Sequence, residues 1–309
     1  MKTVFMGTPD FAATVLKYLY DSDNEVCMVF TQPDRAKDRG KKVQYTPVKE
    51  LALAHGTPVL QPQKLKGDEA AMEELRKASP DIIVVAAYGQ ILSEEVLSLP
   101  KYGCINVHAS LLPKLRGASP IQMAIVTGEK ETGVTVMQME KGLDTGDMLS
   151  SESIEIGNMT AGMLHDSLAD IGGRLLIKTM KEISEEKVKP VKQDDGKATY
   201  AGLISKKDGK IDFSKSPEEI ERLIRGFDPW PGAFCYLEEE QIKFWKAVPT
   251  DEKTEAKDGC VISSDEGGLK IACGGRILTV TEIQAPGKKR MNAEDYLRGH
   301  KIEPGTLLK

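Results

Sequence analysis

The first half of the chain alternates short apolar runs with segments of helical periodicity. Helical spacing begins at Pro9 and recurs over residues 47–55, and Thr160 stands where it can cap a long helix. Five apolar runs have the length and β-branched content of strands, at residues 3–6, 25–31, 81–87, 102–110 and 132–139. Strands that alternate with helices form a parallel sheet with crossover helices. We therefore expect an α/β domain, a Rossmann-like parallel sheet, over residues 1–189.

The pattern changes after residue 187, where Lys, Asp and Gly become frequent. This composition predicts a linker, which we place at residues 190–207. Helical spacing follows at 217–226, and Asn292 with Asp295 predicts the cap of a late helix. Period-two runs lie at residues 233–237, 242–248, 261–263, 269–272 and 277–281. Five short strands with Gly-rich turns predict a small OB-like β-barrel domain over residues 208–309.

Composition excludes several other classes of protein. The 28 Gly and 16 Pro have no period, which argues against collagen and low-complexity disorder. The longest apolar run, residues 82–88, is too short for a membrane span, and the chain starts without the apolar core of a signal peptide. The five cysteines include no Cys-x-x-Cys. We therefore expect a reduced, cytoplasmic chain with no bound metal. The sequence has no exposed apolar repeat that would require an obligate partner, so we also expect a monomer.

The run at 102–110 carries polar side chains at every second position. Asn106, His108 and Ser110 share one face of a strand, because successive side chains point to opposite faces. Ligands bind at the carboxyl ends of strands in open α/β sheets. From the spacing alone, a functional row and a half-solvated strand face are equally acceptable interpretations.

A second polar cluster surrounds Asp144, which lies between Gly142 and Gly146. Two glycines allow a tight loop that could hold a carboxylate close to other groups. Taken alone, the cluster is better explained as an ordinary Asp/Gly turn.

The chain has a net charge of −5, which excludes a uniformly cationic nucleic-acid binder. Positive charge is nevertheless concentrated at residues 34–42, with five basic and two acidic residues, and at residues 288–290. Such runs are usually solvated loops, and they can also contact phosphates.

Several motifs together resemble the methionyl-tRNA formyltransferases, within the folate-dependent formyltransferases. They are Gly-Thr-Pro-Asp-Phe at 7–11, Gln-Pro-Asp-Arg at 32–35, Gly-Lys-Lys at 40–42, Asn-Val-His-Ala-Ser-Leu-Leu-Pro at 106–113, Arg-Gly-Ala-Ser-Pro-Ile-Gln at 116–122, Gly-Leu-Asp-Thr-Gly-Asp at 142–147, Phe-Asp-Pro-Trp-Pro at 227–231 and Pro-Gly-Lys-Lys at 286–289. The resemblance covers essentially the whole chain. It departs at Ser119, where the family usually has Ala, and at 202–204, where a proline is expected.

The resemblance implies transfer of a formyl group from 10-formyltetrahydrofolate to the α-amine of methionyl initiator tRNA. It implies catalytic roles for Asn106, His108 and Asp144. The folate site would be lined by Ser110, Leu111, Leu112 and Pro113, and tRNA would be contacted by Arg35, Arg39, Lys41, Lys42, Lys288 and Lys289.

Two alternatives remain. A formyltransferase acting on an amino-sugar nucleotide would keep the three catalytic residues and would not need the cationic loop. A non-catalytic RNA-binding relative is disfavoured because all three catalytic positions carry polar residues.

Overall fold

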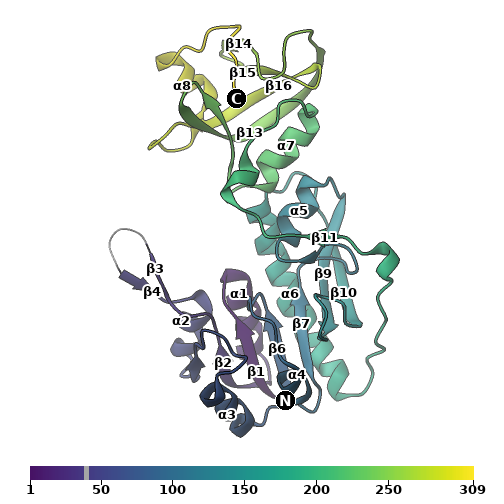
Figure 1. Cartoon of the computed structure of the whole chain (residues 1–309). Coiled ribbons are helices and arrows are strands. Elements are labelled where there is room, and N and C mark those ends of the chain that lie inside the picture. Colours follow the sequence, from purple (N-terminus) through teal and green to yellow (C-terminus); the bar gives the residue numbers. More distant parts are fainter. Residues whose placement is uncertain (38–41) are drawn as a thin grey trace. The chain divides into compact units, whose positions relative to one another are not determined.

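The computed structural model describes the backbone of residues 1–37 and 42–309 and the side chains of residues 1–34 and 44–309. The chain forms two compact units (Figure 1). Unit 1 comprises Met1–Pro120, Thr132–Glu155 and His165–Ala201, and unit 2 comprises Ile121–Glu131, Ile156–Leu164 and Gly202–Lys309. No helix in the described ranges is both long and apolar enough to cross a membrane.

Unit 1 is built on a seven-stranded sheet with the order β10-β9-β7-β6-β1-β2-β5. The strands are β1 (Lys2–Gly7), β2 (Glu25–Phe30), β5 (Val59–Leu60), β6 (Ile82–Ala86), β7 (Cys104–His108), β9 (Glu131–Gln138) and β10 (Met148–Glu155). The pairs from β5 to β7 are parallel, whereas β7 and β9 are antiparallel. The expected parallel sheet is thus parallel over five strands and mixed at one side, because β9 enters from the edge at which β7 ends.

The helices of this part of the chain are α1 (Asp10–Tyr20), α2 (Pro47–Ala54), α3 (Glu69–Ala78), α4 (Glu94–Ser98) and α6 (Ala161–Ser184). The structure confirms the helices expected near Pro9, at 47–55 and after Thr160. The hydroxyl of Thr160 accepts a hydrogen bond from the Met163 N–H at 3.3 Å, as its capping position predicts. Helices α3 and α4, whose N-caps are Asp68 and Ser93, were not predicted from the sequence.

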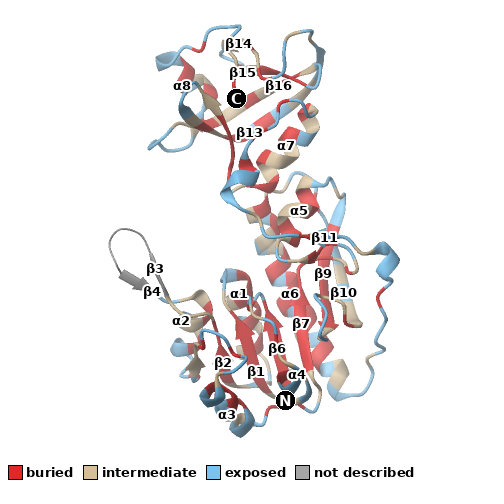
Figure 2. Cartoon of the chain, viewed as in Figure 1, coloured by how far each residue is buried: buried red, intermediate tan, exposed pale blue. Residues whose placement is uncertain are grey.

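The middle of the sheet is the most deeply buried part of unit 1. All residues of β6 and β7 are buried, and these two strands are accordingly red in Figure 2. A polar side chain on β7 therefore has no direct access to bulk water and must be matched by protein groups or by a ligand.

Two short pairings complete unit 1. Strands β3 (Arg35–Lys37) and β4 (Lys42–Gln44) pair antiparallel, with Ala36 opposite Val43. Strand β8 (Arg116–Gly117) pairs parallel with β11 (Tyr200–Ala201). A bridge between Met148 and Val191 and the short helix η1 (Asp195–Lys197) precede β11. Residues 191–201 of the expected linker thus lie against unit 1 as a strap.

Unit 2 contains a bent antiparallel sheet with the order β12-β13-β16-β15-β14, and β17 pairs with β16. The long strand β13 changes register with β16 three times, and such bulges bend a strand. The elements are α5 (Pro120–Val126), η2 (Lys206–Gly209), α7 (Pro217–Gly226), β12 (Ala233–Leu237), β13 (Glu240–Lys253), β14 (Val261–Asp265), β15 (Gly268–Cys273), β16 (Arg276–Gln284), β17 (Met291–Asn292) and α8 (Ala293–Gly299). All five expected strands and both expected helices are present.

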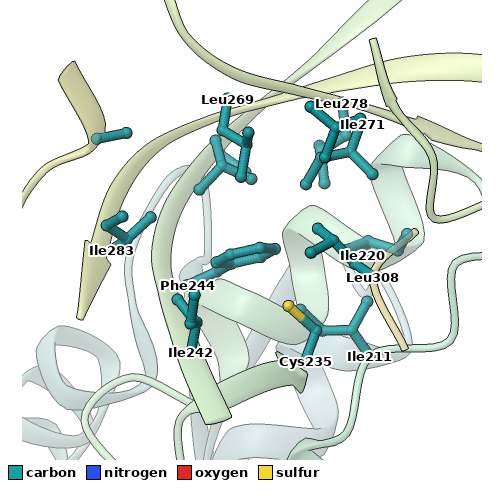
Figure 3. Packing of buried hydrophobic residues seen from close by; sticks show 14 of the residues in the cluster. Ile211, Ile220, Cys235, Ile242, Phe244, Leu269, Ile271, Leu278, Ile283 and Leu308 are labelled. Atoms are coloured by element: carbon teal, nitrogen blue, oxygen red, sulfur yellow. The ribbon is translucent and has the colours of Figure 1, made fainter. Parts of the chain in front are cut away.

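The core of unit 2 is formed by the sheet with helices α7 and α8, and α7 packs against β13 and β16. Phe244 of β13 lies among aliphatic side chains that include Ile220 of α7, Leu269 of β15 and Leu278 of β16 (Figure 3). Asn292 precedes α8 as expected, but its side chain makes no capping hydrogen bond with the described residues. Burial of apolar side chains on one face of each strand explains why the period-two pattern predicted these strands well.

Candidate active site

Two polar side chains lie on β7 as it reaches the carboxyl edge of the sheet. Asn106 is opposite Val85 of β6, and His108 is opposite Thr135 of β9. Both side chains are buried. The alternation that predicted a shared face for Asn106 and His108 therefore holds, and it places two hydrogen-bonding groups side by side at the edge where ligands bind in such sheets.

Ser110 does not continue this row, so the prediction that it shares the strand face with Asn106 and His108 is wrong. Strand β7 ends at His108, and Ser110 lies in the turn that follows. Its hydroxyl donates to the Lys114 carbonyl at 2.6 Å, and its own carbonyl accepts from the Thr135 hydroxyl at 2.7 Å. These two bonds turn the chain away from the strand direction.

Asp144 comes from a distant loop and meets the two residues of β7. One carboxylate oxygen, Oδ1, lies 3.5 Å from Asn106 Nδ2. The other, Oδ2, lies 3.7 Å from His108 Nδ1 and accepts a hydrogen bond from the Gly117 N–H at 2.8 Å. The structure thus brings together the three predicted catalytic residues. The contacts to Asn106 and His108 are long, as catalytic hydrogen bonds often are before substrate binds.

The tautomer of His108 follows from its other ring nitrogen. Nε2 lies 3.1 Å from the Leu115 carbonyl oxygen, which can only accept, so Nε2 carries a hydrogen. Nδ1 is consequently the ring atom that faces Asp144 and can exchange a proton. Leu115 is held by a 2.9 Å bond from its N–H to the Thr199 hydroxyl, on the strap.

Gln193 contacts the Asp144 turn and Arg116 contacts Gln193, and neither residue was predicted from the sequence to belong to the site. Arg116 stands in one of the family-like motifs, and Gln193 stands in the segment assigned to a linker. Burial lowers the pKa of Arg116, but the interactions of the guanidinium with Asp195 and Tyr200 together outweigh this effect, so the pKa lies above its usual value. The guanidinium is therefore charged although it is almost fully buried.

The four residues expected to line a folate site differ in burial and in their contacts with protein groups. Leu112 is buried, and its N–H donates to the Thr135 hydroxyl at 3.1 Å. Leu111 covers Gly133 of β9, where an added Cβ would lie 2.6 Å from Leu111 Cδ2. Ser110 is buried and Pro113 is half-buried. Leu111 and Pro113 retain the exposure that contact with a ligand requires.

A pocket of about 580 Å³ opens at the carboxyl ends of β1, β2 and β6. The Tyr88 carbonyl accepts from Thr8 Oγ1 at 3.3 Å and from Gln32 Nε2 at 3.0 Å within it. The volume is in the usual range for a small-molecule site. It is lined by Thr8, Pro9, Gln32, Pro33, Gln44, Tyr45, Thr46, Pro47, Ala87, Tyr88 and Gly89.

No group of three or more His, Cys, Asp or Glu side chains in the described residues is arranged to hold a metal ion. The site brings together an amide, an imidazole and a carboxylate, which can donate hydrogen bonds and move protons.

The positive residues expected to contact tRNA fall into two groups. Arg39 and Lys41 lie outside the described residues, and the structure describes the backbone of Arg35 and Lys42 but not their side chains. Lys288 and Lys289, in unit 2, are exposed on the turn between β16 and β17.

A cation-rich surface adjoins this turn within unit 2. Arg290 forms two hydrogen bonds with Asp228, at 2.5 and 3.0 Å, and its guanidinium lies 3.4 Å from the ring centroid of Trp245. Burial, together with the charges of Lys206 and Arg290, lowers the pKa of Lys243.

Comparisons with known proteins agree with the two-part architecture. Residues 1–180 match the family described as "Formyl transferase", and residues 203–301 match "Formyl transferase, C-terminal domain". The chain is 50% identical over 309 residues to the methionyl-tRNA formyltransferase of Clostridium tetani, which covers 100% of this chain and 99% of that protein.

Two solved structures share the fold at low sequence identity. An N-formyltransferase from Helicobacter canadensis, in complex with folinic acid and dTDP-3-aminofucose, has a TM-score of 0.68 at 20% identity and covers 94% of this chain and 100% of that chain. A methionyl-tRNA formyltransferase from Clostridium thermocellum has a TM-score of 0.56 at 19% identity, covering 89% and 100%. The family match over more than half of the chain and the full-length relative at 50% identity lead to one conclusion: this chain belongs to the family of methionyl-tRNA formyltransferases.

Proposed function

We propose that the chain transfers the formyl group of 10-formyltetrahydrofolate to the α-amine of methionyl initiator tRNA, for translation initiation. The observation that carries the proposal is the meeting of Asn106, His108 and Asp144 at the carboxyl edge of the sheet. It occurs in a chain that is half identical, from end to end, to a methionyl-tRNA formyltransferase.

Formyl transfer requires two kinds of help from the protein. When the neutral amine attacks the formyl carbon, the new C–N bond places negative charge on the formyl oxygen. When the bond from that carbon to N10 of the folate breaks, N10 needs a proton and the former amine must lose one. A site therefore has to supply a donor for the oxyanion and a group that moves a proton.

Asn106 and the His108–Asp144 pair match these two requirements. The Asn106 amide has two hydrogens, and only one can point at Asp144, so the other is available to the formyl oxygen. In the proposed mechanism the pair accepts the proton of the attacking amine and returns a proton to N10. Because Nε2 of His108 is bound to the Leu115 carbonyl, Nδ1 and the Asp144 carboxylate are the groups that carry the proton.

We further propose that residues 1–189 form the catalytic domain, 190–207 a linker and 208–309 a tRNA-contacting domain. The two family matches, at 1–180 and 203–301, support this division. The contacts of residues 191–201 with unit 1 support a linker that begins as a strap on the catalytic domain.

The pocket beside β1, β2 and β6 supports a substrate site next to the catalytic residues. Ala87 and Gly89 in its lining follow β6, which is the direct neighbour of β7. We assign one of the two substrates to this pocket, and we assign contacts with the folate to the segment from Ser110 through Leu111 and Leu112 to Pro113.

The exposed Lys288 and Lys289 support tRNA contact by unit 2, and the basic composition of residues 34–42 supports it in unit 1. We assign Arg35, Arg39, Lys41 and Lys42 to the same role on composition alone. The five cysteines are free thiols, which is consistent with a reducing compartment. We propose that the enzyme acts in the cytoplasm as a monomer.

The competing substrate is an amino-sugar nucleotide, because sugar formyltransferases share the fold. The identity of 50% over the full length of the methionyl-tRNA enzyme of C. tetani supports the tRNA substrate. The decisive assay supplies 10-formyltetrahydrofolate with methionyl initiator tRNA in one reaction and with a dTDP-amino sugar in another. We expect formylation of the tRNA-linked amine; formylation of the sugar alone, or of neither, would overturn the proposal.

A further inference from the structure

The backbone of Asp144 has a conformation that needs outside support. Its φ is +52°, in the left-handed region that residues other than Gly rarely occupy. The turn is also tightly packed, since a Cβ at Gly146 would lie 1.8 Å from the Gln138 carbonyl oxygen. A carboxylate on such a turn keeps its position only if surrounding groups hold the backbone in place.

Gln193 provides that support with both hydrogens of its side-chain amide. Its Nε2 donates to the Asp144 carbonyl at 2.8 Å and to the Gly146 carbonyl at 2.7 Å. The two bonds fix the backbone carbonyl groups on either side of residue 145. Gln193 is only 5% exposed, so water cannot readily replace either bond.

Arg116 fixes the orientation of the Gln193 amide. The Gln193 Oε1 accepts from Arg116 Nε at 3.0 Å and from Arg116 Nη2 at 2.8 Å. A flipped amide would direct its NH₂ group at the guanidinium and its oxygen at two carbonyls, so a single orientation satisfies all four bonds. Arg116 is 2% exposed, and its Nη2 also meets Asp195 at 2.8 Å.

The same short strand fixes the other end of Asp144. Gly117, directly after Arg116 in β8, donates its N–H to Asp144 Oδ2. Its φ is +111°, and a Cβ there would lie 2.6 Å from the Ala201 carbonyl oxygen. Asp144 is thus held at its backbone by Gln193 and at its carboxylate by Gly117, and both contacts depend on the pairing of β8 with the strap.

From this arrangement we infer that Gln193 is a positioning residue for formyl transfer: held by Arg116, it keeps the Asp144 turn in the geometry that presents the carboxylate to His108 and Asn106. The inference rests on the proposed function, because it acts through the role assigned to Asp144. The strap of residues 191–201 then helps to position a catalytic group, in addition to connecting the two units.

The test measures single-turnover formyl transfer at saturating concentrations of both substrates. Displacement of a catalytic group by about 1 Å can lower a rate by about 100-fold. We expect Gln193→Ala to lower the rate about 10- to 100-fold while the KM of each substrate changes by less than about threefold. Gln193→Met, which fills the space and donates no hydrogen bond, should show the same loss and keeps the test valid if the alanine variant does not fold.

A double-mutant cycle with Asp144→Asn separates positioning from general damage. If Gln193 acts through Asp144, adding Gln193→Ala to Asp144→Asn should lower the rate by less than about threefold further, because coupled residues are not additive. A full additional loss in that background, or no loss in the single variant, would overturn the inference. An intact rate in Asp144→Asn alone would instead overturn the role proposed for Asp144.

Gln61 supplies a matched control within unit 1. Its amide also connects a cation to oxygen acceptors: Nε2 donates to the Gln32 carbonyl and to Asp34 Oδ1, and Oε1 accepts from Lys49 Nζ. Gln61→Ala should lower stability comparably and leave the saturated rate within about threefold of the parent. Equal rate losses in the Gln61 and Gln193 variants would show that Gln193 is merely structural.

Discussion

The polar groups around Asp144 and those around Lys289 differ in how deeply they are buried and in whether they form a hydrogen-bonded network. In unit 1, Gln193 and Arg116 are almost completely buried, and their hydrogen bonds lead from one polar group to the next. In unit 2, Lys288 and Lys289 are exposed on a turn. A buried network fixes geometry, because each lost bond leaves a desolvated partner, whereas exposed cations act through a field that salt screens.

The two regions should therefore respond differently to substitution. Removal of one group at the active site should cause a large loss that is not additive with its neighbours. Removal of one exposed lysine should cause a small loss that adds to the next and depends on salt. The four experiments below test this contrast, beginning with the largest expected effect.

The largest effect is expected when Asp144 or His108 is replaced. Asp144→Asn and His108→Ala should each lower turnover by about 100-fold or more, since acid–base groups and oxyanion donors each contribute on that scale. Circular dichroism and thermal unfolding serve as the check that each variant is folded. A variant with near-native turnover at saturating substrates would remove that residue from the mechanism.

Arg116→Met should produce the largest loss of stability among the exchanges considered. It leaves the Gln193 oxygen buried without its two donors, which should lower the free energy of unfolding by about 1–3 kcal/mol. The matched exchange in unit 2 is Arg298→Met, since the Arg298 side chain is 67% exposed and pairs with Glu294 and Asp295. That exchange should cost less than about 1 kcal/mol. Denaturant titration compares the two, and equal losses would contradict the contrast between the units.

The sequence predicted the site to the extent that the site is local. Alternation along one strand placed Asn106 and His108 on one face, but the catalytic roles of these two residues and of Asp144 followed only from the resemblance to the family, since the local pattern around Asp144 favoured an ordinary turn. Gln193 gave no comparable signal, because it reaches Asp144 from 49 positions along the chain and sits in a segment with the composition of a linker. A contact of that kind depends on tertiary structure, which local periodicity does not encode.

The same limit explains the errors in the expected fold. The period-two pattern located β12 and β16 because each buries one face. It extended the strand at 102–110 too far, since the bonds of Ser110 with Lys114 and Thr135 end β7 at His108. It also did not show that β9 runs antiparallel to β7, because hydrophobic patterning specifies a face and not a direction.

Asp34 forms a largely buried ion pair with Lys49, and the contribution of this pair to stability can be tested by varying the pH. Burial raises the pKa of this carboxyl, but hydrogen bonds from Lys49 and Gln61, together with the charge of Lys49 and a backbone hydrogen bond, outweigh burial, so the pKa lies below its usual value. A lowered folded-state pKa contributes stability above the unfolded value, about 3.9, and the contribution is lost as the pH falls through the folded-state pKa. Asp34→Asn should therefore be less stable than the parent by about 1–2 kcal/mol at pH 7, and the difference should shrink below about pH 4. A difference that is constant with pH would show that the charge of Asp34 is not responsible.

The smallest effect is expected from the exposed lysines of unit 2. If Lys288 and Lys289 each contact one phosphate, each change to alanine should flatten the log–log dependence of tRNA affinity on salt by about 0.7–0.9. Between 50 and 200 mM salt this corresponds to about a threefold change in affinity per lysine, and the double variant should show the sum of the two changes in slope.

Lys301→Ala is a control on the same unit, since Lys301 is exposed and paired with Glu303. Binding measured by filter retention over this salt range decides the assignment: slopes equal to that of the parent would exclude both lysines from the RNA contact. Slopes that change by less in the double variant than in the sum of the singles would mean that the exposed cations are coupled as the buried network is.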